Sequence, residues 1–308
     1  MNRKGIVVSI IVGVVIAGSM FSQTSNTPAR NEADLLRRMQ DMRALDSYSR
    51  RQSDKDKRDL DAFNPPVLDK KTKERIKQMR LFDNRDIERY SSFLTGQNTG
   101  IVKLFPNFEC VAEKVIRIDG DCTNFVPESS DFSFRTVTYT NHLYHDIGYE
   151  RSGLVSDAFF SQGIFTTLGD VPIEKVDQNT PGVSFLLDFV PETKAETARR
   201  RLHAFDQGLT VGGARYSRNA EPDENMTYAM RVIAYKVGNS LPPITDDSTM
   251  LEIKFKSLEM DKRDDITVAF RIIRVGNDRG LTIVWKELDR KDAPKIKFAS
   301  GEILTDFK

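Results

Sequence analysis

The sequence lacks the short motifs by which several large enzyme classes are recognised. It contains no His-Glu-x-x-His, no Gly-x-x-x-x-Gly-Lys-Ser/Thr and no Gly-x-Gly-x-x-Gly, which removes the usual zinc-peptidase, P-loop and dinucleotide-binding patterns. The nearest approach to the serine-hydrolase motif Gly-x-Ser-x-Gly is at residues 182–186, where the second glycine is missing. The sequence therefore predicts no cofactor, and it favours a non-enzymatic protein without deciding the question.

A charge excess of one sign is missing as well. The 46 Lys and Arg residues nearly balance the 45 Asp and Glu residues, so the net charge is +1 and gives no general attraction to nucleic acid. We therefore expect no nucleic-acid partner. Charged residues make up 30% and hydrophobic residues 39% of the chain, which is more polar than an average globular domain. Part of the chain is expected to be solvated, and we place that part at residues 22–75.

Cysteine is scarce, with Cys110 and Cys122 on either side of a turn signal, Asp-Gly-Asp, at residues 119–121. In an oxidising compartment the two would form a disulfide, and in a reducing one they would be free buried thiols. A zinc site with His142 and His145 is the third alternative. Structural zinc sites have cysteines two to four residues apart, whereas eleven residues separate these two, so we expect no metal.

The amino terminus carries an export pattern. Two basic residues are followed by the apolar run 6–21, as in the charged and apolar regions of a signal peptide. Small residues at 17–19 offer a cleavage site. The run is shorter than the roughly 20 residues that span a bilayer comfortably. Residues 1–22 are thus predicted to be a cleaved signal peptide or an uncleaved anchor, and the protein to be extracytoplasmic, periplasmic or secreted, or held in the inner membrane by a single pass through 6–21.

Two regions are predicted after this pattern. Residues 23–94 read as a charged linker and helices, with helical stretches at 70–81 and 85–94. Residues 95–308 read as a β-rich extracytoplasmic domain, because short strand-like runs alternate with turn residues. The predicted fold class is α+β, mainly β, with an antiparallel β-rich domain preceded by N-terminal helices and the signal or anchor segment.

Within the β-rich region, one helix is expected at 193–205, where small and apolar residues line one face. The alternation of apolar and charged residues at 251–256 is typical of a half-buried strand, and 266–272 repeats it. These segments and the strand after the turn at 276–280 are predicted to form an antiparallel meander with one solvated face. The predicted strands are 101–105, 110–118, 132–139, 154–165, 183–190, 226–237, 249–258, 266–275, 281–287 and 295–299.

Carboxylate pairs are harder to exclude than motifs, because a glycosidase needs only two acids at the right distance and sequence spacing does not report that distance. Asp170 is the candidate catalytic residue, since it lies between a glycine and a residue held before a proline. The alternative is an aspartate that caps a turn. The acids of the central region are Asp131, Asp146, Asp157, Asp170, Asp188 and Glu174.

Three segments, at residues 93–100, 166–172 and 225–231, resemble those of uncharacterised exported proteins of bacteria. The resemblance covers approximately residues 93–288. It supports a domain over that range, and it implies no activity or catalytic residues.

Together these observations favour an extracytoplasmic β-rich binding or structural module of the cell envelope, whose partner is an unknown envelope protein or glycan. The alternative is a carboxylate-dependent hydrolase that acts on an envelope polymer. A third possibility is that residues 32–94 mediate self-association, with the β-rich domain as a spacer.

Overall fold

The computed structural model describes residues 58–59, 61–112, 114–117, 119–237, 249–300 and 302. Contacts between Cα atoms divide the chain into two units, residues 1–53 and 54–308, and the described residues all belong to the second. The predicted signal or anchor lies outside the described residues. Among the residues that are described, no helix is both long enough and apolar enough to cross a bilayer.

The described unit is mainly β, with antiparallel sheets and a few short helices. The strands of a seven-stranded antiparallel sheet are, in spatial order, β1 (Thr99–Leu104), β15 (Leu281–Asp292), β14 (Asp264–Val275), β12 (Thr227–Ala234), β8 (Ser161–Gly169), β10 (Ala214–Ser217) and β9 (Leu209–Val211). Those of a five-stranded antiparallel sheet are β11 (Asn219–Ala220), β7 (Gly153–Val155), β6 (Ile147–Glu150), β4 (Asp131–Ser133) and β5 (Thr138–Tyr139). Two ribbons pair β2 (Val111–Ala112) with β3 (Val115–Ile116) and β13 (Lys236–Val237) with β16 (Lys295–Ile296).

Short helices connect and cover these sheets. The α-helices are α2 (Lys70–Met79), α3 (Asn84–Arg89), α4 (Ser91–Leu94), α5 (Val183–Asp188), α6 (Ala195–Asp206) and α7 (Thr249–Ser257). The 3-10 helices are η1 (Gly120–Asn124), η2 (Ile173–Lys175) and η3 (Leu258–Met260). The helix predicted at 193–205 is confirmed as α6, and the two N-terminal helical stretches are confirmed as α2 and α3–α4.

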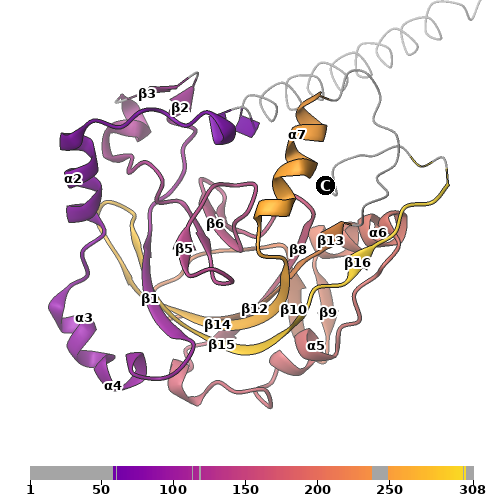
Figure 1. Ribbon diagram of the computed structural model, residues 1–308. Coiled ribbons are helices and arrows are strands. Elements are labelled where there is room, and N and C mark those ends of the chain that lie inside the picture. Colours follow the sequence, from indigo (N-terminus) through magenta and orange to yellow (C-terminus); the bar gives the residue numbers. More distant parts are fainter. Residues whose placement is uncertain are drawn as a thin grey trace, which may run out of the picture. The chain divides into compact units, whose positions relative to one another are not determined.

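The seven-stranded sheet is covered on both faces and forms the middle layer of the unit (Figure 1). Ile266, Val268 and Phe270 of β14 pack against the five-stranded sheet, whereas Ala269 and Ile273 belong to the core that β14 shares with α5, α6 and α7. The hairpin of β14 and β15 confirms two strands of the predicted meander. The predicted solvated face is wrong, because the chain supplies a covering layer for each face.

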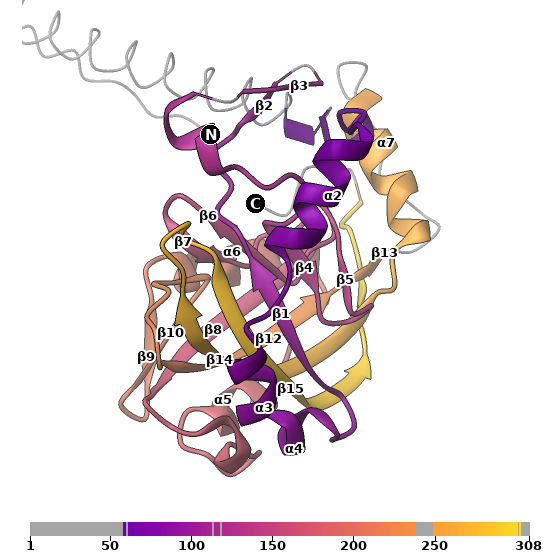
Figure 2. The same cartoon turned by 90° about the vertical axis from the view of Figure 1, so that its left-hand side faces the viewer.

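Helices α2, α3 and α4 follow one another along the β1 edge of the seven-stranded sheet (Figure 2). Ile76 of α2 packs with Phe105, which follows β1 directly. Asp86 of α3 forms an ion pair with Arg274 of β14 at 2.8 Å. An uncovered edge strand invites pairing with other chains, and these helices lie along that edge.

Two segments that were expected to be strands are helices. The alternation at 251–256 is part of α7, because Leu251, Phe255 and Leu258 also have helical spacing and pack on the core shared with α5 and α6. The segment 183–190 contains α5, which begins after Gly182, whose φ of 91° turns the chain sharply. A short segment can satisfy the strand period and the helical period equally well. In both cases packing against the sheet selects the helix.

Buried guanidinium groups tie helix ends and loops to the seven-stranded sheet. Arg231 of β12 is ion-paired with Asp265 of β14 at 2.7 Å and donates to the carbonyl oxygens of Leu186 and Phe189 at the end of α5. Arg263, just before β14, donates to three backbone carbonyl oxygens, two of which directly precede β8. Buried carbonyl groups need such partners, so these side chains fix where α5 and the start of β8 lie.

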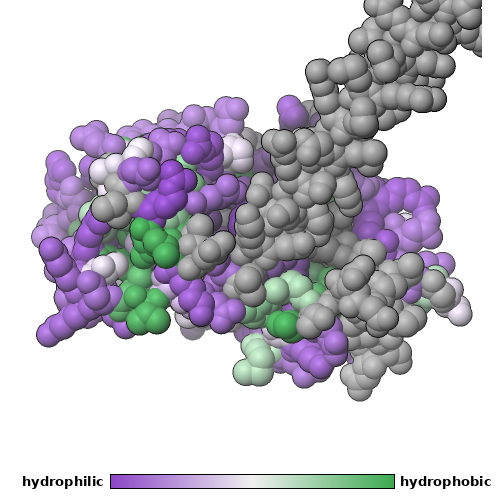
Figure 3. Space-filling view, turned by 90° about the horizontal axis from the view of Figure 1, so that it is seen from above, coloured by the Kyte–Doolittle hydropathy of each residue, from purple (hydrophilic) through white to green (hydrophobic). Residues whose placement is uncertain are grey.

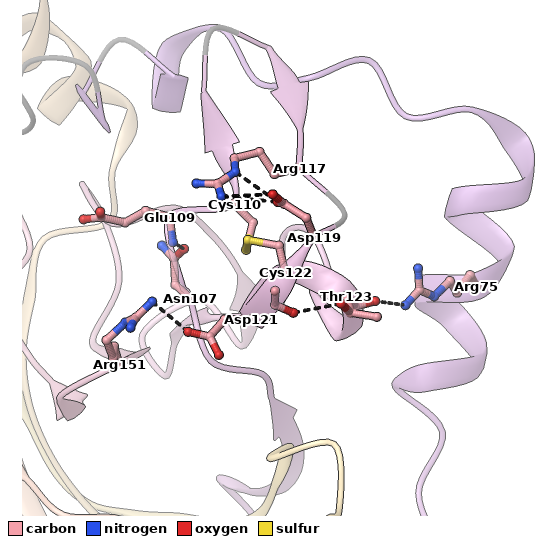
Figure 4. The surroundings of a disulfide bond; sticks show 11 residues. Arg75, Asn107, Glu109, Cys110, Arg117, Asp119, Asp121, Cys122, Thr123 and Arg151 are labelled. Carbon is pink, nitrogen blue, oxygen red and sulfur yellow. Dashed lines mark hydrogen bonds and ion pairs between the residues drawn. A yellow bond between two sulfur atoms is a disulfide. The ribbon is translucent and has the colours of Figure 1, made fainter.

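A disulfide joins Cys110, which precedes β2, to Cys122 in η1, and both side chains are buried with Phe125 in a small satellite core. This pairing agrees with the predicted disulfide. Figure 4 shows the ion pairs around the bond: Asp119 with Arg117, and Asp121 with Arg151. The cross-link therefore fixes the β2–β3 ribbon to η1 at a place where few apolar side chains are available.

Replacing Cys110 and Cys122 together by serine is expected to lower the free energy of unfolding by about 2–3 kcal/mol, because the bond closes a loop with a sequence separation of 12. Urea denaturation measures the effect. Reductant should lower the stability of the wild-type protein and leave that of the double-serine variant unchanged. Equal stability of the oxidised wild type and the variant would contradict the assignment.

Candidate functional site

A pocket of about 490 Å³ lies beside strands β4, β5 and β6. Three further parts of the chain converge on it: the segment 58–66, the C-terminal end of α2, and the residues on either side of the β2–β3 ribbon and η1. The face of the molecule on which β2 and β3 lie is mostly hydrophilic with small hydrophobic patches (Figure 3). The pocket is lined by Arg58, Asp61, Ala62, Pro65, Pro66, Arg80, Asn107, Glu109, Val111, Phe125, Pro127, Glu128, Ser130, Asp131, Tyr139, Thr140, Asn141, His142 and Glu150.

Asp131 of β4 is the most buried carboxylate of the pocket lining, and His145 lies behind it. The imidazole Nδ1 is 2.7 Å from an oxygen of Asp131, and Nε2 is 3.3 Å from an oxygen of Asp157. Burial by itself would lower the pKa of His145, but the hydrogen bonds and charges of the two carboxylates outweigh it and raise that pKa to about 9. The histidine is therefore an imidazolium at neutral pH.

The charge on His145 determines the state of Asp131. Burial would raise the pKa of Asp131, but the hydrogen bond and the positive charge of His145 outweigh it, and the pKa lies below its ordinary value. The hydroxyl of Ser130 donates to the second oxygen of the same carboxylate. Asp131 thus presents an ionised group to the pocket, which accepts hydrogen bonds and attracts cations but cannot donate a proton.

Arg80, directly after α2, and Tyr139 of β5 form one wall of the pocket. The guanidinium carbon of Arg80 lies 3.8 Å from the centre of the Tyr139 ring, and its Nε donates to the hydroxyl of Ser129 at 2.9 Å. The Tyr139 hydroxyl donates to the backbone carbonyl of Lys103 in β1. Burial lowers the pKa of Arg80 and raises that of Tyr139. Arg80 is held by Tyr139 and Ser129, and Tyr139 is held by Arg80 and the carbonyl of Lys103. This wall of the pocket therefore exists without a ligand.

The segment 58–66 is fastened to the rest of the unit by Asp59. Its carboxylate lies 2.8 Å from Lys254 Nζ of α7 and 2.9 Å from His142 Nε2, and the side chains of Asp59 and Lys254 are each only 4% exposed. Burial would raise the pKa of Asp59, but His142 and Lys254 outweigh it and lower the pKa to about 2. This buried contact places Arg58 and Asp61, on either side of it, in the pocket wall.

Two glutamates gather around one arginine at an end of the pocket. Nη1 of Arg58 is 3.7 Å from Glu109 Oε1 and 3.5 Å from Glu150 Oε1. Glu109 has a positive φ of 57°, an uncommon conformation for a residue other than glycine. Such partly exposed pairs add little to stability, so their main effect is to bring two carboxylates together on the rim.

Asp170, the catalytic candidate from the sequence, lies outside this pocket. Its side chain is 73% exposed, and it forms an ion pair at 2.6 Å with Arg271, whose own side chain is buried. Arg271 also donates to the backbone carbonyl of Val171 and to the hydroxyl of Thr227. Asp170 is therefore the solvent-side partner of a buried arginine, and its catalytic role stays a prediction.

The other acids of the central region have separate positions. Asp131 and Asp157 meet at His145, as described above, and Asp131 alone of the six lines the pocket. Asp146 pairs with Arg135 at 2.6 Å, and both of these side chains are fully buried. The remaining two are Asp188 at the end of α5 and Glu174 in η2.

The zinc alternative is not supported. Cys110 and Cys122 are bonded to each other, so neither offers a thiolate, and His142 and His145 contact different carboxylates. Among the described parts of the chain, no three His, Cys, Asp or Glu side chains gather as metal ligands.

Most residues of the pocket had no signal in the sequence, because six separate segments contribute them and no spacing relates one to another. Asp131 was among the acids considered, and His142 was considered only as a zinc ligand. The cluster of polar residues at 139–146, between two short strands, is the feature of the sequence that could have indicated this site.

The protonated His145 makes the stability of the protein depend on pH. Between pH 6.5 and 9 the folded protein keeps a proton on His145 that the unfolded chain loses, so the stabilising contribution is complete below pH 6.5 and is lost as the pH rises through about 9. We expect the free energy of unfolding to fall by about 3 kcal/mol across this window. Urea denaturation at a series of pH values measures it.

Two variants serve as comparison and control for this measurement. His145→Gln should remove most of the slope. His203→Gln should retain it, because His203 lies on α6 with its side chain 74% exposed. Identical slopes in the wild type and His145→Gln would show that another group is responsible.

Comparisons with family models, with curated proteins and with solved structures found no match to this chain, so its own residues carry the functional argument.

Proposed function

We propose that this chain is an extracytoplasmic β-rich binding module of the cell envelope, and that it holds a polar ligand in the pocket beside β4, β5 and β6. The observation that carries the proposal is the ionised Asp131 in the pocket lining, kept charged by a buried imidazolium. Burying a charged group costs free energy. A carboxylate that stays ionised in a pocket can bind a ligand that carries ammonium or hydroxyl donors.

The location is supported by two independent features. The disulfide between Cys110 and Cys122 favours an oxidising compartment. The sequence of residues 1–22 has the charged and apolar regions of an export signal or an anchor. The partner is then an envelope protein or glycan.

The size and lining of the pocket fit a ligand of a few sugar or amino-acid units. Its volume of about 490 Å³ lies within the range of small-molecule sites. Apolar surface comes from Pro66, Phe125 and Pro127, and directional groups come from Asn107 and Asn141. Because the Arg80–Tyr139 wall and the Asp59 contact are formed in the protein alone, little ordering is needed on binding.

Binding to the pocket is tested with two short probes, the tripeptide Lys-Ser-Lys and a glucosamine disaccharide, by isothermal titration calorimetry on the full chain. We expect measurable affinity for at least one probe. Thr140→Trp, which adds bulk in the pocket lining, should reduce it tenfold or more, by about 1.4 kcal/mol.

The control is Val67→Trp, which adds the same bulk at a residue that is 97% exposed and lies outside the lining. This variant should bind as the wild type does. No binding of either probe, or equal binding by Thr140→Trp, would contradict the proposal.

A carboxylate-dependent hydrolase acting on an envelope polymer is the second candidate, and the meeting of Glu109 and Glu150 at Arg58 is the observation that favours it. Glycosidases use two acids that flank the bond to be cleaved. Asp170 is not part of this arrangement.

This candidate predicts that the wild-type protein releases soluble fragments from an envelope polymer such as peptidoglycan or a β-glucan. Glu150→Gln should lower the rate by about a hundredfold or more, as loss of an acid or base catalyst does, and Asp170→Asn should leave it unchanged. Release of reducing ends is the measurement. An inactive wild type, or an unaffected Glu150→Gln, would dispose of the hydrolase.

A further inference from the structure

Two further hollows lie near the pocket. A second hollow of about 420 Å³ shares Arg58, Asn107, Glu109 and Glu150 with the pocket. A third, of about 170 Å³, shares Phe108 with the second. The second hollow is thus next to the pocket, and the third is next to the second across the Phe108 ring; we call the three together the groove.

The three hollows repeat one combination of chemical groups. Each has a carboxylate, a side-chain amide and an apolar ring. These are Asp131, Asn141 and Phe125 in the pocket, Glu150, Asn107 and Phe108 in the second hollow, and Asp278, Asn277 and Pro106 in the third. Glu150 and Asn107 also line the pocket, so the pocket and the second hollow share these two groups, and the third hollow adds a separate set. A ligand that is itself a chain of similar units would meet the combination more than once.

Seven carboxylates and four guanidinium groups line the groove, and the ion pairs there engage groups of both signs. Arg58 contacts two glutamates, Arg80 lies on Tyr139, Arg151 pairs with Asp121 at 2.9 Å, and Arg279 lies 4.8 Å from the ring centre of Phe108. The chain as a whole has a net charge of only +1. The groove is thus a local acidic feature, which favours a cationic ligand.

We infer that the groove binds an extended, basic peptide segment of a partner protein. This inference rests on the proposed function and names the class of ligand. A lysine or arginine side chain has an apolar stem and a cationic head, which match a ring and a carboxylate in the same hollow. The amides of Asn107 and Asn277 match the donors and acceptors of a peptide backbone. An amino sugar would satisfy the carboxylates, but it has no long apolar stem for the rings.

The test is fluorescence anisotropy with the oxidised full chain and a labelled nonapeptide in which five lysines alternate with four serines. The nonapeptide should bind about tenfold more tightly than the labelled tripeptide Lys-Ser-Lys, because it reaches all three hollows. A nonapeptide with glutamate in place of lysine should not bind. A glucosamine hexamer serves as the glycan probe.

Asp278→Asn tests the third hollow, which is separate from the pocket. It keeps an oxygen for the backbone N–H of Gly280, with which Asp278 bonds in the wild type. The variant should weaken the nonapeptide about two- to fivefold and leave the tripeptide unchanged. Glu88→Gln removes the same charge from an exposed residue of α3 that lines none of the hollows, and it should change neither.

Equal affinity for the two lysine peptides, or no effect of Asp278→Asn, would overturn the groove and would leave the binding of short probes to the pocket standing. Tighter binding of the glucosamine hexamer than of the nonapeptide would overturn the peptide assignment. The proposed function itself is decided separately, by the short probes and Thr140→Trp.

Discussion

Buried arginine side chains are the constraint on which the arrangement of loops in this protein depends. Each of four, Arg135, Arg231, Arg263 and Arg271, pairs with a carboxylate and also donates to backbone carbonyl oxygens. A guanidinium group removed from water needs several acceptors at once, so each of them fixes the positions of all its partners. Apolar packing holds the layers of the structure together. The contacts of the buried arginines determine the path of the loops that connect those layers.

The pocket follows from one of these contacts. Arg135, just after β4, donates to the carbonyl oxygen of Tyr144 and pairs with Asp146, which holds the turn between β5 and β6. That turn carries the two histidines, and it directs His142 toward Asp59 and His145 toward Asp131. The Asp131 carboxylate, which lines the pocket, is thereby positioned through Arg135 and Asp146, which do not line it.

The sequence was sufficient to predict secondary structure where its hydrophobic residues follow either the helical period or the strand period but not both. This holds for β14, β15 and α6, each of which has 12 residues and so carries a long pattern. It was insufficient at 251–256, where the alternation is real but packing of Phe255 selects the helix and Lys254 finds a buried partner. The pocket could not be predicted, because its residues come together only when six segments of the chain fold. The prediction of Asp170 rested on its neighbours in the sequence alone.

The disulfide between Cys110 and Cys122 also affects the wall of the pocket. Cys110 sits between Glu109 and Val111, both of which line the pocket, and Cys122 is packed with Phe125 on the same side. When the two cysteines are reduced, the bond that joins the segment before β2 to η1 is missing from this wall. The redox state of a single cysteine pair is thereby coupled to the structure of the pocket wall.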